Sequence, residues 1–111
     1  MTTKHDLTPP AAVAANARKG LALREKFGRG GTEVGVKRAE GLAARHPVTE
    51  NDIVHIASYF ARHAVDKGTH THHWADDTDP SAGYIAWLLW GGDEGQAWAD
   101  EIKGKVASEK S

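Results

Sequence analysis

Cysteine is absent from this chain, which excludes a disulfide-stapled scaffold, a thiolate metal site and a cysteine nucleophile, and makes a reducing compartment the simpler setting. Long apolar runs are absent too, because none approaches the roughly 20 residues that span a bilayer. The first residues, MTTKHDLTPP, have neither the basic start nor the apolar core of a signal peptide. We therefore expect a soluble protein without a membrane partner, and its 111 residues suffice for one domain.

The net charge of −1 conceals a difference between the two halves of the chain. Residues 1–46 carry nine Lys and Arg against four Asp and Glu, a net charge of +5. Residues 47–111 carry five against eleven, a net charge of −6. This split is compatible with nucleic-acid contact through the first half, with head-to-tail docking between copies, or with two solvated faces that partly pair within one fold.

Capping residues and apolar spacing predict an all-α fold, a single compact domain of about five helices. Its helical body covers about residues 9–107, between a polar arm at 1–8 and a tail at 108–111. The helices are expected at about 9–27, 33–45, 50–67, 80–90 and 93–107.

Each expected helix begins at a residue whose side chain can accept a hydrogen bond from the first turn. In the first and fourth helices this residue precedes a proline, which is well tolerated at the first helical position. In the third helix an acidic residue follows three positions later, which completes a capping box, and in the last helix Gln96 holds that position. The expected N-caps are Thr8, Thr32, Thr49, Asp79 and Asp93.

Residues 28–32, GRGGT, form a glycine-rich connector after the first helix. A dinucleotide-binding fingerprint needs glycine at the first, third and sixth places, but Glu33 occupies the sixth. A P-loop needs lysine directly after its second glycine, but Val36 follows Gly35. The connector is therefore interpreted as a flexible turn rather than a phosphate-binding loop.

The stretch GYIAWLLWGGDEGQAWA, residues 83–99, holds three of the four tryptophans and is interrupted by Gly-Gly-Asp. Its apolar run from Tyr84 to Trp90 fits a buried strand or a buried helix, and the flanking proline and glycines favour the helix. We expect a tight helix-Gly-Gly-Asp-helix corner with its indoles packed inside. The expected core residues are Phe60, Trp87, Trp90 and Trp98.

The segments ASYFARHAVDK, residues 57–67, and PSAGYIAWLLWGGDEGQAWA, residues 80–99, together resemble a family of small uncharacterised helical proteins and modules of tailed bacteriophages and prophages. Residues 19–43 are similar to the N-terminal part of that family, so the likeness covers roughly residues 11–102. The resemblance implies a phage origin, a setting among head or packaging proteins, and a location in the host cytoplasm or the virion. It supplies no catalytic residues.

A histidine-rich loop is expected at residues 68–79. Imidazole and carboxylate groups of this loop are suitable ligands for zinc, nickel or copper. Adjacent histidines need an irregular backbone to converge on one ion, so a polar, partly exposed loop is the simpler interpretation and no cofactor is expected. The candidate metal ligands are His70, His72, His73 and Asp76.

The third helix carries His55, Tyr59 and His63 at intervals of four residues, a spacing that predicts a polar groove. His63 with Asp66 resembles part of a hydrolytic site. Neither a nucleophile nor an oxyanion donor accompanies this pair. An enzyme is therefore the third choice of function, as a metal-dependent enzyme that uses the histidine-rich loop.

Arg62 lies on another side of the same helix from Phe60. Its guanidinium is expected to form a bidentate ion pair with Asp79 or Asp93. Such a pair would attach the third helix to the tryptophan corner.

Basic residues surround the first glycine-rich turn and are the candidates for nucleic-acid contact. A helix-turn-helix at 80–107 is disfavoured, because its second helix would begin with DEGQAWADE, whose acids repel phosphates. The candidates are Arg18, Lys19, Arg24, Lys26, Arg29, Lys37 and Arg38.

The function predicted from the sequence is a non-catalytic interaction module in virion assembly or DNA packaging, which docks to a phage structural or host protein through charge-asymmetric surfaces. Self-association is compatible with this prediction. The alternative is a nucleic-acid-binding accessory protein that uses residues 18–38, with little sequence preference.

Overall fold

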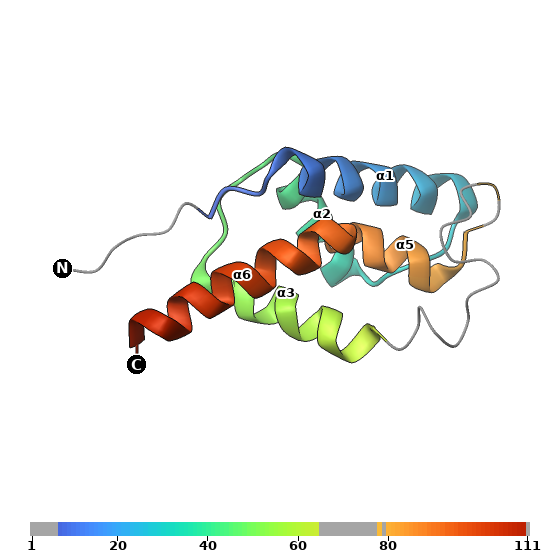
Figure 1. The fold of residues 1–111 in the computed structure, drawn as a ribbon. Coiled ribbons are helices and arrows are strands. Elements are labelled where there is room, and N and C mark those ends of the chain that lie inside the picture. The colour runs from blue at the N-terminus through green and yellow to red at the C-terminus, as the bar shows by residue number, and fades with distance from the viewer. Residues whose placement is uncertain (1–6, 65–77, 79, 111) are drawn as a thin grey trace.

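A computed structural model of the protein describes residues 7–64, 78 and 80–110 (Figure 1). Over these residues the secondary structure is helical, which confirms the all-α, single-domain prediction. The helices are α1 (Ala11–Phe27), α2 (Glu33–Ala43), α3 (Glu50–His63), α5 (Ala82–Leu89) and α6 (Gly92–Lys110).

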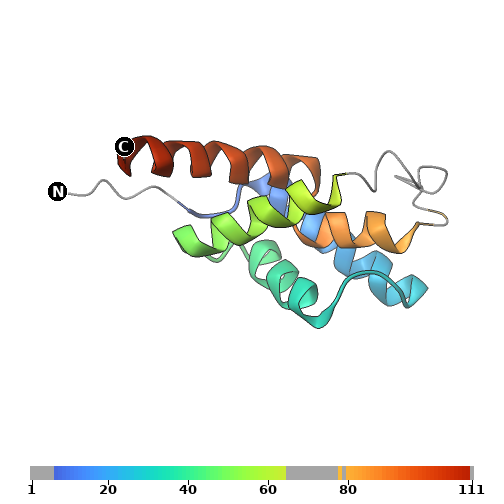
Figure 2. The same cartoon turned by 90° about the horizontal axis from the view of Figure 1, so that it is seen from below.

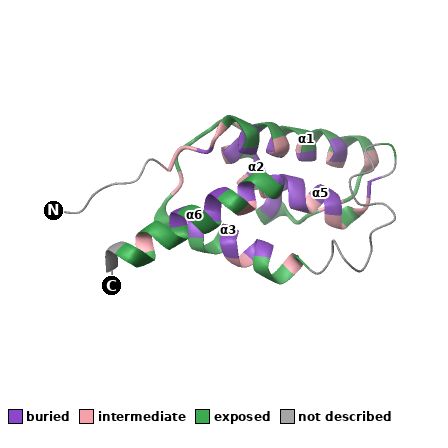
Figure 3. Ribbon diagram, in the orientation of Figure 1, coloured by how far each residue is buried: buried purple, intermediate pink, exposed green. Residues whose placement is uncertain are grey.

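Helix α1 packs against α2, α5 and α6, and α3 packs against α6. Helices α5 and α6 follow one another along the length of the molecule, and the last turns of α6 extend past the rest of the helical body (Figures 1 and 2). Buried residues occupy the inward sides of the helices (Figure 3). Helix α6 reaches Lys110, so it includes residues expected in the C-terminal tail.

Three of the helix ends expected from the sequence are formed. The Thr32 hydroxyl accepts a hydrogen bond from the Gly35 amide at 3.3 Å. Thr49 and Asp52 form both hydrogen bonds of the capping box, at 2.9 and 3.0 Å. Gly28 ends α1 in the left-handed conformation, with φ of 65°. Helix α2 ends at Ala43 rather than residue 45, and the segment 65–67 of the expected third helix lies outside the described residues.

The expected start of α1 is wrong by two residues. Pro10, rather than Thr8, is the N-cap, with φ of −60° and ψ of 158°. The physical reason is that Pro9 itself precedes a proline, and a residue in that position is driven away from the helical conformation. The helix therefore begins only after both prolines.

The fourth expected helix also begins later than predicted. Ser81 is its N-cap, and the Ser81 hydroxyl accepts a hydrogen bond from the Tyr84 amide at 3.1 Å. That hydroxyl satisfies an N–H of the first turn, so Pro80 stays outside the helix. Asp79, the predicted cap, lies outside the described residues.

The Gly-Gly corner joins α5 to α6 as expected. Asp93, however, is not the N-cap of α6. Helix α6 already begins at Gly92, which puts Asp93 in the first turn. Its carboxylate accepts a hydrogen bond from Trp87 Nε1 at 2.9 Å, across the corner. From α1, Asn16 Nδ2 donates to the Gly91 carbonyl at 2.8 Å and to Glu94 Oε1 at 2.7 Å. The corner is therefore held to both α5 and α1.

The predicted aromatic core forms around Phe60, Trp87 and Trp98, which are 0, 2 and 8 % exposed. The rings of Phe60 and Trp87 meet edge to face, with centroids 4.7 Å apart. Trp90 differs from the prediction, because it is half-buried and packs against the core from outside. It follows the last turn of α5, where its indole stacks on Tyr59 at the surface.

Candidate functional site

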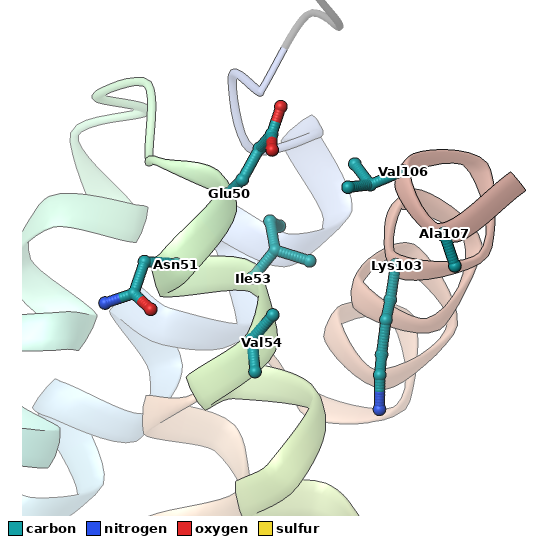
Figure 4. Close-up of a pocket in the computed structure, with 7 residues that line it drawn as sticks. All are labelled: Glu50, Asn51, Ile53, Val54, Lys103, Val106 and Ala107. Carbon is teal, nitrogen blue, oxygen red and sulfur yellow. The ribbon is translucent and has the colours of Figure 1, made fainter. Parts of the chain in front are cut away.

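A groove opens between the first turns of α3 and the last turns of α6, with a volume of about 480 Å³ (Figure 4). We call it the α3–α6 groove. At this end of the molecule the last turns of α6 extend past the rest of the helical body (Figures 1 and 2). Its lining residues are Glu50, Asn51, Ile53, Val54, Lys103, Val106 and Ala107.

The interior of the α3–α6 groove is apolar. Ile53 is 1 % exposed and Val106 is half-buried, whereas Val54 is 43 % exposed. Among the residues that the structure describes, Val54 and Val34 are the large hydrophobic residues with exposed side chains. Glu50 stands on the α3 wall and Lys103 on the α6 wall (Figure 4). The groove therefore offers apolar contact between one negative and one positive wall.

The capping box fixes the start of α3 and so positions its wall of the groove. Asp52 also forms an ion pair with Arg38 of α2 at 3.1 Å. Burial alone would raise the pKa of Asp52, but hydrogen bonds from Thr49 and the Arg38 guanidinium outweigh it and hold this pKa below its usual range. The carboxylate is thus stabilised in the charged form that both contacts require.

A second hollow, of about 520 Å³, lies at the other end of α3. We call it the aromatic hollow. It forms where the loop before α2, the last turn of α3 and one side of α5 meet. Its lining residues are Gly31, Thr32, Val34, Tyr59, Arg62, His63, Ala82, Gly83, Ala86 and Trp90.

The two ionic predictions for the tryptophan corner have different outcomes. The pair between Arg62 and Asp93 does not form within the described part of the chain, because Asp93 engages Trp87 and Arg62 lines the aromatic hollow. The alternative partner, Asp79, lies outside the described residues.

The proposed metal ligands His70, His72, His73 and Asp76 lie outside the described residues, as does Asp66. Over residues 7–64, 78 and 80–110, no group of three or more His, Asp or Glu residues is placed to hold a metal ion. Of the expected polar groove on α3, Tyr59 is buried, and the His63 ring lies against it with centroids 4.5 Å apart. The disfavoured pair of His63 with Asp66 is not tested, because Asp66 lies outside the described residues.

The candidates for nucleic-acid contact touch several different elements of the fold. Arg18 donates to the Ala43 carbonyl at 2.9 Å, and Arg24 donates to the Gly30 carbonyl at 3.0 Å. Lys19 lies 5.8 Å from the centre of the Tyr84 ring of α5, whereas Arg38 points to α3, where it pairs with Asp52.

The remaining candidates lie near the end of α1 and on α2. Lys26 and Arg29 both lie over the Phe27 ring, at 5.4 and 5.5 Å. Lys37 and Arg24 share a shallow depression with Glu33 and Glu40, whose charges oppose their own. Nucleic-acid binding through residues 18–38 stays an untested prediction.

Sequence reasoning missed the α3–α6 groove. Val54 carried a usable signal, because it falls outside the apolar positions 53, 56, 57 and 60 that face the core. A contiguous apolar surface can mark a contact site, and Val54 belongs to one only together with Ile53 and Val106. Its neighbours from α6 gave no comparable signal.

Comparison of the chain with protein families, curated proteins and solved structures finds no match. The resemblance to phage-encoded proteins therefore stays a prediction. Among the described helices, none combines the length and the apolar character needed to cross a membrane.

Proposed function

We propose that this protein is a non-catalytic interaction module that binds an amphipathic helix of a partner protein in the α3–α6 groove. The observation that carries the proposal is the exposed Val54 beside Ile53 and Val106, in a groove bounded by two helices. Grooves of this shape take the apolar face of a helix, whose anchors recur at three- and four-residue intervals. Burying the exposed part of Val54 contributes roughly 1 kcal/mol.

The charges on the two walls specify the chemistry of the partner. Glu50 on α3 favours a basic residue along one flank of the bound helix, and Lys103 on α6 favours an acidic residue along the other. Opposite charges on opposite walls fix the direction of the bound helix more than they add affinity. The partner is therefore a helix with an apolar stripe between a basic and an acidic flank.

The setting of this interaction is also a proposal. The resemblance to phage-encoded proteins suggests virion assembly or DNA packaging, with a phage structural protein or a host protein as the partner. Binding of nucleic acid is not advanced as a second function, because the basic side chains of α1 and α2 point to different neighbours.

Photocrosslinking tests the proposal at the groove itself. A benzoylphenylalanine replaces Val54 in phage-infected cells, and Val34, the other exposed valine, receives the same substitution as a matched control. We expect a crosslink from position 54, but not from 34, to a segment with the stated apolar stripe and flanks. A synthetic peptide of that segment is then titrated against the wild-type protein and the Val54→Asp and Val34→Asp variants.

We expect Val54→Asp to weaken peptide binding about tenfold or more, because an acidic group would be buried against the apolar stripe. Val34→Asp should leave the affinity unchanged. The proposal fails if both variants weaken binding equally, if positions 54 and 34 crosslink to the same segments, or if the product at 54 is a dimer of this chain.

A further inference from the structure

Several of the residues that line the aromatic hollow are small. The residues contributed by α5 are Ala82, Gly83 and Ala86. Gly31, from the connector between α1 and α2, lies beside them. Gly31 has a φ of +74°, and a Cβ placed on it would lie 2.5 Å from Leu89 Cδ1. The glycine-rich connector is therefore not a free turn, because Gly31 has a left-handed φ that favours glycine and its backbone lies against Leu89 and Ala86 of α5.

Stacked rings form the wall of the hollow. The centre of the Tyr59 ring lies 4.5 Å from that of Trp90, with the planes 5° from parallel, and 4.5 Å from that of His63, with the planes 31° apart. The Arg38 guanidinium lies 5.5 Å from the centre of the Trp90 ring and is held by its ion pair with Asp52. The wall is thus braced from α2 and presents a preformed aromatic surface.

Among the described lining residues of the hollow, the charged side chain is the cation Arg62. Arg62 lines it with an exposed side chain, and among the described lining residues none is Asp or Glu. A guanidinium binds a carboxylate or a phosphate through two parallel hydrogen bonds. Val34, 64 % exposed, adds an apolar edge from the first turn of α2.

We infer that the aromatic hollow binds a small aromatic anion, with its ring over the small residues of α5 beside Trp90 and its carboxylate or phosphate on Arg62. A volume of about 520 Å³ falls within the range of small-molecule sites, which combine apolar walls with few polar groups. This site lies at the opposite end of α3 from the α3–α6 groove, so the inference is independent of the proposed function.

Titration by NMR tests the inference with defined probes. The probes are 1-naphthoate, 1-naphthyl phosphate and the uncharged 1-naphthylmethanol, and the signals followed are the Trp90 indole N–H and the Gly31 and Gly83 amides. We expect both anions to shift these signals and to bind more tightly than the alcohol. The tighter of the two anions distinguishes a carboxylate site from a phosphate site.

Variants of the exposed Arg62 separate charge from shape. Arg62→Gln should weaken binding of the preferred anion roughly tenfold, because a charge-assisted contact is lost, and should leave the alcohol unaffected. Arg62→Lys should retain part of the affinity. Lys103→Gln, in the α3–α6 groove, should change neither the affinity for the anion nor that for the alcohol. The inference is overturned if the probes leave the three signals unmoved, or if Arg62→Gln and Lys103→Gln bind the anions equally.

Discussion

Replacing Gly20 by alanine provides a sharp test of how α1 packs on α5. Gly20 is a buried residue in the middle of α1, and a Cβ built on it would lie 2.8 Å from the Leu89 amide nitrogen and 3.0 Å from Leu88 Cβ. The nearest of these atoms belongs to the backbone and cannot rotate away. Gly41 in α2 is the matched control, because a Cβ there would meet nothing within 4 Å.

The two substitutions should have opposite effects on stability. At both positions alanine gains about 0.5–1 kcal/mol over glycine within a helix. At Gly20 this gain is offset by the cost of overpacking. We expect that cost to be about 3 kcal/mol, the upper end of the usual range for overpacking, because α1 and α5 must move apart to make room for the Cβ. We therefore expect Gly20→Ala to lower the free energy of unfolding by about 2 kcal/mol, and Gly41→Ala to raise it by up to about 1 kcal/mol.

Urea unfolding followed by circular dichroism measures both changes, and thermal unfolding supports them, since 1 kcal/mol shifts the midpoint by about 4–8 °C in a domain of this size class. A double variant should show the sum of the two effects, because the substituted residues have no common neighbour in these contacts. If Gly20→Ala were as stabilising as Gly41→Ala, the close approach of α1 to α5 would be refuted.

Two further predictions concern polar contacts. Asp52→Asn should lower the free energy of unfolding by roughly 1 kcal/mol at pH 7, since it weakens the Arg38 ion pair and the capping box. Because the pKa of Asp52 is lowered in the folded state, its contribution is present above the unfolded value near 3.9 and is lost as the pH falls through the folded value. Urea curves at pH 7 and at about pH 2 should thus show a deficit that shrinks in acid, and a constant deficit would contradict the ionic explanation. Trp87→Phe removes the 2.9 Å hydrogen bond to Asp93 and should lower the free energy of unfolding by about 2 kcal/mol. In a double-mutant cycle with Asp93→Ala, the two changes in the free energy of unfolding should not add. Strict additivity would show that the two side chains are not coupled.

The sequence by itself determined the features that depend on neighbours within a few residues. Thr32 and Thr49 cap their helices, and Gly28 ends α1, because these contacts are made to the adjoining turn. The apolar spacing of α3 likewise placed Phe60 in the core. The missed starts of α1 and α5 are also local, since they follow from the Pro9-Pro10 pair and from Ser81.

Only the tertiary structure decided what surfaces these helices make. The α3–α6 groove joins Val54 to Val106, and the aromatic hollow joins the loop at Gly31 to Arg62 and Trp90. By its helix propensity, Gly20 is expected to destabilise the middle of α1. In the structure it permits the close contact between α1 and α5. Whether a side chain is buried, is exposed or clashes with a neighbour depends on which distant segment packs beside it. Helical periodicity carries no information on which segment that is.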